Sequence, residues 1–267
     1  MVGIFDSGVG GLSVWREIVR ELPDVPTLYV ADQAHVPYGP RPLEEVRRFA
    51  EGITRFLLAQ GATVVVLACN TASAAALRHL RAVFPQVPFV GMEPAVKPAV
   101  QRTRNGRVGV IATPATFQGE LFASLLKRFA RDVRVIPQVC PGLVEAVEDG
   151  ALDAPETEAL LRSCLEPLLA AGIDELVLGC THYPFLRPLI EHIVGPGVEI
   201  VDPAPAVARQ VRRVLEQSSA GYQPALPTFY TTGDPARFAR ALDRLMGVQA
   251  EVHALRWKGD SLHPVYR

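Results

Sequence analysis

The sequence has almost no excess charge and few lysines. Its 267 residues include 27 basic and 28 acidic side chains, giving a formal net charge of −1. Binding to a nucleic-acid backbone requires a basic surface, so we expect no nucleic-acid partner. Lysine occurs only at Lys97, Lys127 and Lys258. None of them follows a glycine-rich strand end of the kind that would suggest a lysine bound to pyridoxal phosphate.

Long hydrophobic runs are also missing. The longest, residues 62–69 and 176–180, are much shorter than the roughly 20 residues that a helix needs to cross a bilayer. The first residues lead directly into an apolar strand pattern, without the basic and apolar segments of a secretory signal. We therefore expect no membrane partner and a cytoplasmic location.

Metal-binding motifs are absent as well. The sequence has no H-E-x-x-H and no paired Cys/His spacing, so we expect neither a metal nor a cofactor. In a long chain without an export signal, cysteines are more often free thiols than disulfide partners. We therefore expect free thiols at Cys69, Cys140, Cys164 and Cys180. Cys140 and Cys164, the latter within a helical stretch, are predicted to be structural.

Apolar, strand-like segments alternate with longer helical stretches, which is typical of α/β proteins with mostly parallel sheets. A helix is predicted over residues 43–60, where apolar side chains recur with a period near 3.6. A loop rich in Ser, Gly and Pro is expected over 218–227, before a strand at 228–231 and a helix at 235–245. The earlier predicted strands cover residues 2–5, 27–30, 63–68, 88–91, 107–111, 133–137, 175–178 and 199–201.

Two pairs of segments suggest an internal repeat. Residues 3–7 resemble residues 109–113, and residues 65–71 resemble residues 176–182, at nearly the same separation. Chance resemblance between short strand ends is the alternative, but the repeated order favours duplication. We expect two pseudo-symmetric α/β domains, formed by residues 1–95 with 205–267 and by residues 96–204. The active site is predicted in the cleft between them.

Cys69 and Cys180 each follow a buried-type strand, where ligands bind in open α/β sheets. The polar residues Asn70, Thr71 and Thr181 come next and can begin a helix. A helix N-terminus lowers the pKa of a nearby thiol, so we expect reactive thiols at both places. A buried cysteine that serves only as a small hydrophobic residue is the alternative, but two cysteines at equivalent strand ends favour function.

Two thiols on opposite faces of a substrate can invert an amino-acid α-carbon. One thiolate removes the α-proton, and the other thiol supplies a proton to the opposite face. A duplicated fold with a shared cleft provides such a pair. The cysteines and the repeat therefore predict the same chemistry, a racemase.

Other polar segments can complete the site. Asp6 opens a glycine-rich loop whose backbone N–H groups are expected to face an anion. A dinucleotide-binding loop is disfavoured because Ser13 stands where the third glycine is needed. Further candidates are Tyr38 in a Pro-Tyr-Gly-Pro turn, the hydroxyls of Thr113 and Thr116, and His182.

Five motifs carry a family resemblance: GIFDSGVGGL at 3–12, VPYG at 36–39, ACNTAS at 68–73, IATPAT at 111–116 and LGCTHYP at 178–184. In this order and spacing they make the chain resemble the bacterial glutamate racemases, within the aspartate/glutamate racemase superfamily. The chain departs from the family pattern at Asp32-Gln33-Ala34-His35, where Asp-Thr-Ala-Arg is usual, and at Gly119, where Ser is common.

The resemblance implies two α/β domains around a cleft, a homodimer, glutamate as substrate, and D-glutamate supplied for peptidoglycan. It implies that Cys69 and Cys180 are the acid/base thiols, assisted by Asp6 and His182. The other implied substrate contacts are Ser7, Tyr38, Gly39, Asn70, Thr71, Thr113, Thr116, Glu148 and Thr181. Two alternatives are another member of the superfamily, such as an aspartate racemase, and a catalytically silent protein that binds acidic amino acids.

Overall fold

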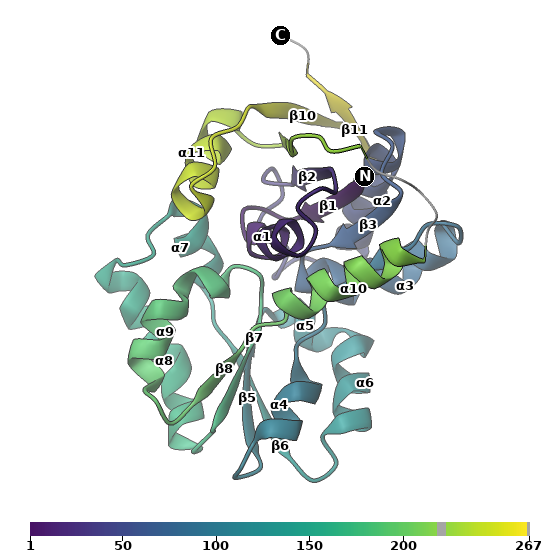
Figure 1. Ribbon diagram of the computed structural model, residues 1–267. Coiled ribbons are helices and arrows are strands. Elements are labelled where there is room, and N and C mark those ends of the chain that lie inside the picture. Colours follow the sequence, from purple (N-terminus) through teal and green to yellow (C-terminus); the bar gives the residue numbers. More distant parts are fainter. Residues whose placement is uncertain (218–222, 266–267) are drawn as a thin grey trace.

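A computed structural model describes residues 1–217 and 223–265 of the chain. Helices and strands alternate along the sequence and form two sheets with flanking helices, one in the upper and one in the lower half of Figure 1. The predicted α/β class is therefore confirmed. Part of the predicted loop, residues 218–222, lies outside the described residues, and residues 223–227 carry no helix or strand.

The first sheet contains seven strands in the order β11-β10-β9-β2-β1-β3-β4. Neighbouring strands are parallel except for the antiparallel pair β10 and β11. The central strands are completely buried, as expected for a sheet covered on both faces. The strands are β1 (Val2–Asp6), β2 (Thr27–Ala31), β3 (Val64–Leu67), β4 (Phe89–Val90), β9 (Thr228–Thr231), β10 (Val252–Lys258) and β11 (Ser261–Pro264).

The second sheet has four parallel strands in the order β6-β5-β7-β8: β5 (Arg107–Ala112), β6 (Arg134–Val139), β7 (Glu175–Gly179) and β8 (Glu199–Val201). The segment β2-β1-β3-β4 of the first sheet has the same order. The register also agrees, since Gly3 pairs with Val65 and Gly109 pairs with Leu176. The repeat seen in the sequence is thus a repeat of strand order and register.

Helices cover both faces of each sheet. In the first sheet, α2 (Leu43–Ala59) and α3 (Asn70–Val83) pack together on one side, and α1 (Leu12–Glu21), α10 (Ala204–Glu216) and α11 (Pro235–Met246) on the other. Around the second sheet lie α4 (Val96–Arg102), α5 (Pro114–Gln118), α6 (Glu120–Phe129), α7 (Leu143–Asp149), α8 (Pro155–Ala170), the 3₁₀ turn η1 (Tyr183–Leu186) and α9 (Arg187–Val194).

Helix α2 shows how the sequence pattern produces this packing. Val46, Ile53 and Leu57 recur on one face and are completely buried, while the opposite face stays in water. Burial of each such side chain stabilises the fold by about 1.5–3 kcal/mol. The helix stops before Gly61, whose φ of 88° is left-handed and favours glycine. The predicted helix at 43–60 is confirmed to within one residue.

The hairpin formed by β10 and β11 is not among the elements predicted from the sequence. A two-residue turn at Gly259 and Asp260 joins its strands, and β10 pairs with β9 at the edge of the first sheet. Most residues of β10 are only partly buried or exposed. The run therefore lacks a continuous apolar pattern that would reveal it in the sequence.

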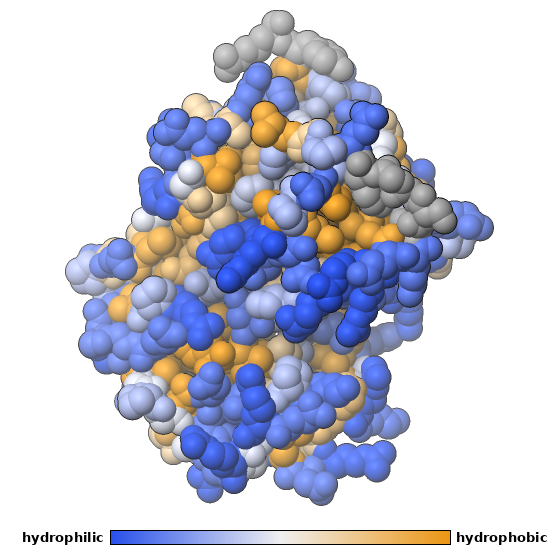
Figure 2. Space-filling view, viewed as in Figure 1, coloured by the Kyte–Doolittle hydropathy of each residue, from blue (hydrophilic) through white to orange (hydrophobic). Residues whose placement is uncertain are grey.

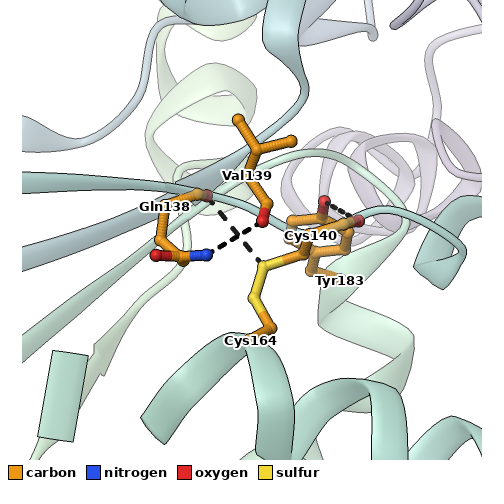
Figure 3. The surroundings of a disulfide bond; sticks show 5 residues. All are labelled: Gln138, Val139, Cys140, Cys164 and Tyr183. Carbon is orange, nitrogen blue, oxygen red and sulfur yellow. Dashed lines mark hydrogen bonds between the residues drawn. A yellow bond between two sulfur atoms is a disulfide. The ribbon is translucent and has the colours of Figure 1, made fainter. Parts of the chain in front are cut away.

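Cys140 and Cys164 form a disulfide, with Cα atoms 5.5 Å apart (Figure 3). The prediction of free thiols is wrong for this pair, and Cys69 and Cys180 are free. Cys140 follows β6, whereas Cys164 lies within α8, as the helical pattern predicted. Composition cannot reveal the bond because only the packing of α8 beside β6 brings residues 24 positions apart together.

The outer faces of α1 and α10 are strongly polar. Figure 2 shows a hydrophilic band across the middle of the molecule, where Figure 1 places these two helices. Arg16, Arg20, Arg209 and Arg213 are exposed there. Within the described residues, no helix combines the length and the apolar character needed to cross a membrane.

Candidate active site

One small cavity lies where loops from the carboxyl ends of the two sheets meet. It holds about 10 Å³, which is room for roughly one water molecule. Loops that follow β1, β2, β3, β5 and β7 contribute to its wall. The lining residues are Ser7, Pro37, Tyr38, Gly39, Cys69, Asn70, Thr71, Thr113, Val144, Cys180, Thr181 and His182.

Cys69 is the residue before helix α3, two positions after the end of β3. Its sulfur accepts a hydrogen bond from the Ala72 N–H, with a distance of 3.4 Å. Burial and the neighbouring Asp6 carboxylate raise the pKa of the Cys69 thiol well above its ordinary value and outweigh that N–H. The helix N-terminus lowers this pKa through the Ala72 N–H, as expected, but the net pKa is raised because desolvation and a nearby negative charge are the larger effects.

Cys180 follows β7 and has a basic partner instead. Its sulfur lies 3.7 Å from Nδ1 of His182, whose Nε2 lies 2.8 Å from Oε1 of Glu148. Burial alone would lower the pKa of His182. The hydrogen bonds and negative charges of Cys180 and Glu148 outweigh burial and raise this pKa well above its ordinary value. His182 is thus suited to carry a positive charge beside the Cys180 sulfur.

Asp6 lies at the end of β1, just below the cavity wall. Its Oδ2 accepts hydrogen bonds from the N–H groups of Gly8 and Gly11, and its Oδ1 accepts one from the Thr181 hydroxyl. Burial raises the pKa of Asp6, although His182 and the two N–H groups oppose this shift. A carboxyl group with a raised pKa beside Cys69 can exchange protons with it.

The glycine-rich loop after β1 packs tightly against this acid/base machinery. A Cβ atom at Gly8 would lie 1.8 Å from Glu148 Oε1, and one at Gly10 would lie 2.3 Å from His182 Nδ1. Only glycine fits at these two positions. The N–H of Val9 donates to Glu148. The loop's N–H groups at Gly8, Val9 and Gly11 therefore bind internal carboxylates, and the expectation that they face a substrate anion is wrong.

Asn70 is the clearest sign that the cavity is built for a polar ligand. Its side chain is 2% exposed, yet neither Oδ1 nor Nδ2 has a hydrogen-bond partner. A buried amide left unpaired costs about 1–3 kcal/mol. A ligand that offers one donor and one acceptor removes that cost.

Hydroxyl groups surround the rest of the cavity. Thr71 and Thr113 share a hydrogen bond of 2.8 Å that joins loops of the two sheets. Thr116 lies behind Thr113, at 3.0 Å, and does not line the cavity. In the part of the chain that the structure describes, no lysine or arginine lines the cavity. A carboxylate bound there can use neutral donors and, among basic side chains, His182.

Tyr38 lines the cavity, but its hydroxyl points elsewhere. It donates to Oδ2 of Asp32 at 2.7 Å. Oδ1 of the completely buried Asp32 accepts from Trp257 and Thr232 at 2.7 and 2.8 Å. Asp32 therefore anchors the loop that carries Tyr38 and Gly39.

Three residues of the site, Asp32, Pro37 and Val144, were not predicted from the sequence. The position of Asp32, directly after strand β2, was the available signal for it, because that is where ligand-facing residues of such sheets lie. Val144 has no signal in the sequence, since its apolar side chain looks like any other in helix α7. Among the predicted residues, Asp6, Thr116 and Glu148 lie behind the lining, and the others line the cavity.

No group of three or more His, Cys, Asp and Glu side chains suited to a metal ion occurs among the residues described by the structure. The ionisable side chains around the cavity instead form two sets. Asp6 accompanies Cys69, while His182 and Glu148 accompany Cys180. Such an arrangement can move a proton at either end of the cavity.

Known proteins resemble the whole chain. A glutamate racemase from Ectopseudomonas mendocina is 56% identical over 254 residues, which cover 94% of this chain and 97% of that protein. A crystal structure of a glutamate racemase isoform from Bacillus anthracis has a TM-score of 0.87 at 34% identity. It covers 95% of this chain and 96% of its own.

A third relative was crystallised with ligands. The Escherichia coli glutamate racemase, in complex with L-glutamate and the activator UDP-MurNAc-ala, has a TM-score of 0.83 at 32% identity. The match covers 91% of this chain and 94% of the other. The family model for Asp/Glu/Hydantoin racemases matches residues 2–211. Since that match spans most of the sequence, the chain belongs to the Asp/Glu/Hydantoin racemase family.

Proposed function

We propose that the protein is a glutamate racemase that interconverts L-glutamate and D-glutamate with two thiols and no cofactor. The observation that carries this proposal is the pair of free thiols in one cavity, each with its own ionisable partner. The relatives of high identity are glutamate racemases, and the Escherichia coli relative binds L-glutamate. Both findings support glutamate as the substrate.

In the proposed reaction the substrate α-carbon lies between the sulfurs of Cys69 and Cys180. The thiolate on one side removes the α-proton and becomes a thiol, leaving a carbanion next to the carboxylate. The thiol on the other side gives its proton to the opposite face and becomes a thiolate. The reverse reaction uses the same groups in exchanged roles.

The ionisable neighbours of the two thiols stabilise the charges that form and accept or donate protons. The imidazolium of His182 stabilises a negative Cys180 sulfur. Asp6 assists at Cys69, where it can accept the thiol proton. Glu148 supports His182 from behind. Water is excluded by burial, which strengthens each of these interactions.

The remaining polar residues hold the substrate. Asn70, with an unpaired donor and an unpaired acceptor, is suited to bind the α-amino and carboxylate groups. Because the cavity holds about 10 Å³, it is too small for glutamate. Its walls must therefore separate to admit the substrate. Further contacts come from the Ser7, Thr71, Thr113 and Thr181 hydroxyls, the backbone at Gly39 and the ring of Tyr38. Thr116 supports Thr113 from behind.

The proposal extends to the cellular role. A glutamate racemase supplies D-glutamate for peptidoglycan, and we place the reaction in the cytoplasm, where both substrate and precursor synthesis are found. We further propose a homodimer, with domains formed by residues 1–95 with 205–267 and by residues 96–204. The two sheets, with strands at 2–90 and 228–264 and at 107–201, support this division.

The decisive experiment follows L-glutamate by circular dichroism after addition of purified protein without cofactor. We expect the signal to decay to zero, because the equilibrium mixture is racemic. In deuterium oxide, solvent deuterium should appear at the α-carbon. An unchanged signal over hours would favour a silent binding protein, and faster racemisation of aspartate would favour an aspartate racemase.

Removal of either thiol should abolish the reaction. We expect Cys69→Ala and Cys180→Ala each to lower kcat by at least about a thousandfold, because each variant lacks the proton carrier on one face. The matched control is Cys140→Ala with Cys164→Ala, which removes two sulfurs outside the cavity and should still racemise. Substantial activity in either single variant contradicts the two-thiol mechanism.

A further inference from the structure

Gln33 links the loops of the two sheets behind the Cys180 side of the cavity. It lies directly after Asp32, beyond the end of β2. Its Nε2 donates to Oε2 of Glu148 at 2.9 Å. Its Oε1 accepts from the hydroxyl of Thr231, on β9, also at 2.9 Å. Position 33 is also one where the chain departs from the usual family motif.

The surrounding bonds fix which end of the amide faces Glu148. The Thr231 hydroxyl accepts the N–H of Gly233 at 3.0 Å, so its own proton is directed to Gln33 Oε1. The NH₂ group of Gln33 must then face the Glu148 carboxylate, which is an acceptor when ionised. The amide orientation and the charge on Glu148 therefore support each other.

Glu148 is held by three donors. Val9 N–H and His182 Nε2 bind its Oε1, at 2.7 and 2.8 Å, and Gln33 binds its Oε2. Burial raises the pKa of Glu148, but the bonds from His182, Gln33 and Val9 outweigh burial and lower it. Gln33 is the only side chain among the described residues that hydrogen-bonds Oε2.

We propose that Gln33 is a positioning residue for the Cys180 half of the site. It holds the Glu148 carboxylate so that His182 keeps its proton and directs Nδ1 at the Cys180 sulfur. This inference rests on the proposed racemase function. The Cys69 half depends on other partners, Asp6 and the Ala72 N–H, so the effect of Gln33 is one-sided.

Few other titratable groups lie near the hydrogen bonds that join Gln33, Glu148 and His182. Asp6, His182 and Tyr29 interact electrostatically with Glu148. Cys180, Glu148 and Asp6 do so with His182. A substitution at position 33 leaves all of them in place. A change in titration can then be assigned to the lost amide.

The test replaces Gln33 with methionine, which has a similar length and no donor. A hydrogen bond to a charged group contributes enough to shift a pKa by about one unit. Without it, the Glu148 carboxylate is no longer held against His182, the ion pair between them weakens, and the His182 pKa falls. We expect the basic limb of the pH profile of kcat/KM to move about one pH unit lower. At pH values above the limb, kcat/KM should be about tenfold lower than in the wild-type protein.

Isotope effects provide the second readout. With α-deuterated substrate, we expect the isotope effect on kcat/KM to rise for the enantiomer whose proton Cys180 removes. It should not rise for the other enantiomer, because the step at Cys69 is unchanged. A merely structural role would affect both enantiomers alike.

Gln138→Met is the matched control, because among the residues described by the structure the Gln138 amide donates to the neighbouring Val139 carbonyl alone. Thermal unfolding checks each variant. If Gln33→Met does not fold, Gln33→Asn gives the same readouts, since its shorter amide cannot reach both partners. A wild-type pH profile, or equal isotope effects for both enantiomers, overturns the inference. Failure of the wild-type protein to racemise glutamate instead overturns the proposed function.

Discussion

The two free thiols of the cavity occupy equivalent positions after β3 and β7 but have opposite electrostatic neighbours. Cys69 lies beside the carboxylate of Asp6, and Cys180 lies beside the imidazole of His182. The backbone repeat therefore does not extend to the groups that control protonation. At the scale of single residues, these neighbours decide which sulfur holds a proton.

Removing the Asp6 charge should make Cys69 more acidic. In a Cys180→Ala background, where Cys69 is the remaining free thiol, we expect Asp6→Asn to lower the Cys69 pKa by at least about one unit. The rate of alkylation by iodoacetamide against pH measures this shift. Cys180→Ala with Asp6 intact is the control. An unchanged alkylation profile would show that burial alone raises this pKa.

Sequence motifs predicted most of the residues that line the cavity but not their electrostatic environment. Cys69, Cys180 and Asn70 were recognisable because they follow strands whose carboxyl ends face the cavity. The raised pKa of Cys69 was not predictable, since it depends on burial and on the position of Asp6. The role of Asp32 depends on Trp257, which lies 225 positions away in the sequence.

At the scale of elements, helix α7 matters because it carries Glu148 to the site. The Cys140–Cys164 disulfide ties the segment before this helix to α8. At its other end, Asp149 pairs with Arg237 of α11 at 2.5 Å. The helix is thus attached to both halves of the molecule.

The disulfide should contribute measurably to stability. Chain entropy for a loop of this length suggests about 3 kcal/mol. We expect a reducing agent to lower the free energy of unfolding by up to that amount, measured by urea denaturation. The Cys140→Ala and Cys164→Ala double variant should already have the lower stability and should not respond to the reductant. An equal response in both proteins would contradict this prediction.

Periodicity and turn residues predicted most of the strands and the helices α2 and α11. Strands with continuous apolar runs and the amphipathic helix α2 were clear because burial imposes their patterns. The hairpin of β10 and β11 was missed because most of its residues are only partly buried or exposed and show no continuous apolar run. The disulfide was missed because it arises from helix packing, which a sequence pattern does not encode.

At the scale of the whole molecule, the site is closed. Contacts across it include the Thr71–Thr113 hydrogen bond and the bond from Ala115 N–H to the Gly39 carbonyl, at 3.3 Å. Near these, a Cβ at Gly119 would lie 2.8 Å from the Cβ of Ala74. Substrate entry must separate these surfaces.

A cross-link at this point should lock the site. Ala74→Cys with Gly119→Cys places two thiols close enough for a disulfide after a small adjustment, since bridged Cβ atoms lie about 3.5–4.5 Å apart. We expect oxidation to reduce glutamate racemisation by at least about tenfold and a reductant to restore it. The single variants and the oxidised wild-type protein are controls. Full activity of the verified cross-linked protein would show that substrate enters without this separation.

The unlike neighbours of the two sulfurs have a kinetic consequence. Mirror-image amino acids have equal free energies, so kcat/KM must be the same in both directions. The two thiols of the free enzyme can nevertheless differ in protonation state between turnovers. In the proposed two-thiol mechanism, burial and the anion beside Cys69 favour a proton on that sulfur in the free enzyme, and this form is ready for only one enantiomer of glutamate. Saturating rates in the two directions should accordingly differ, and the two KM values should differ by the same factor.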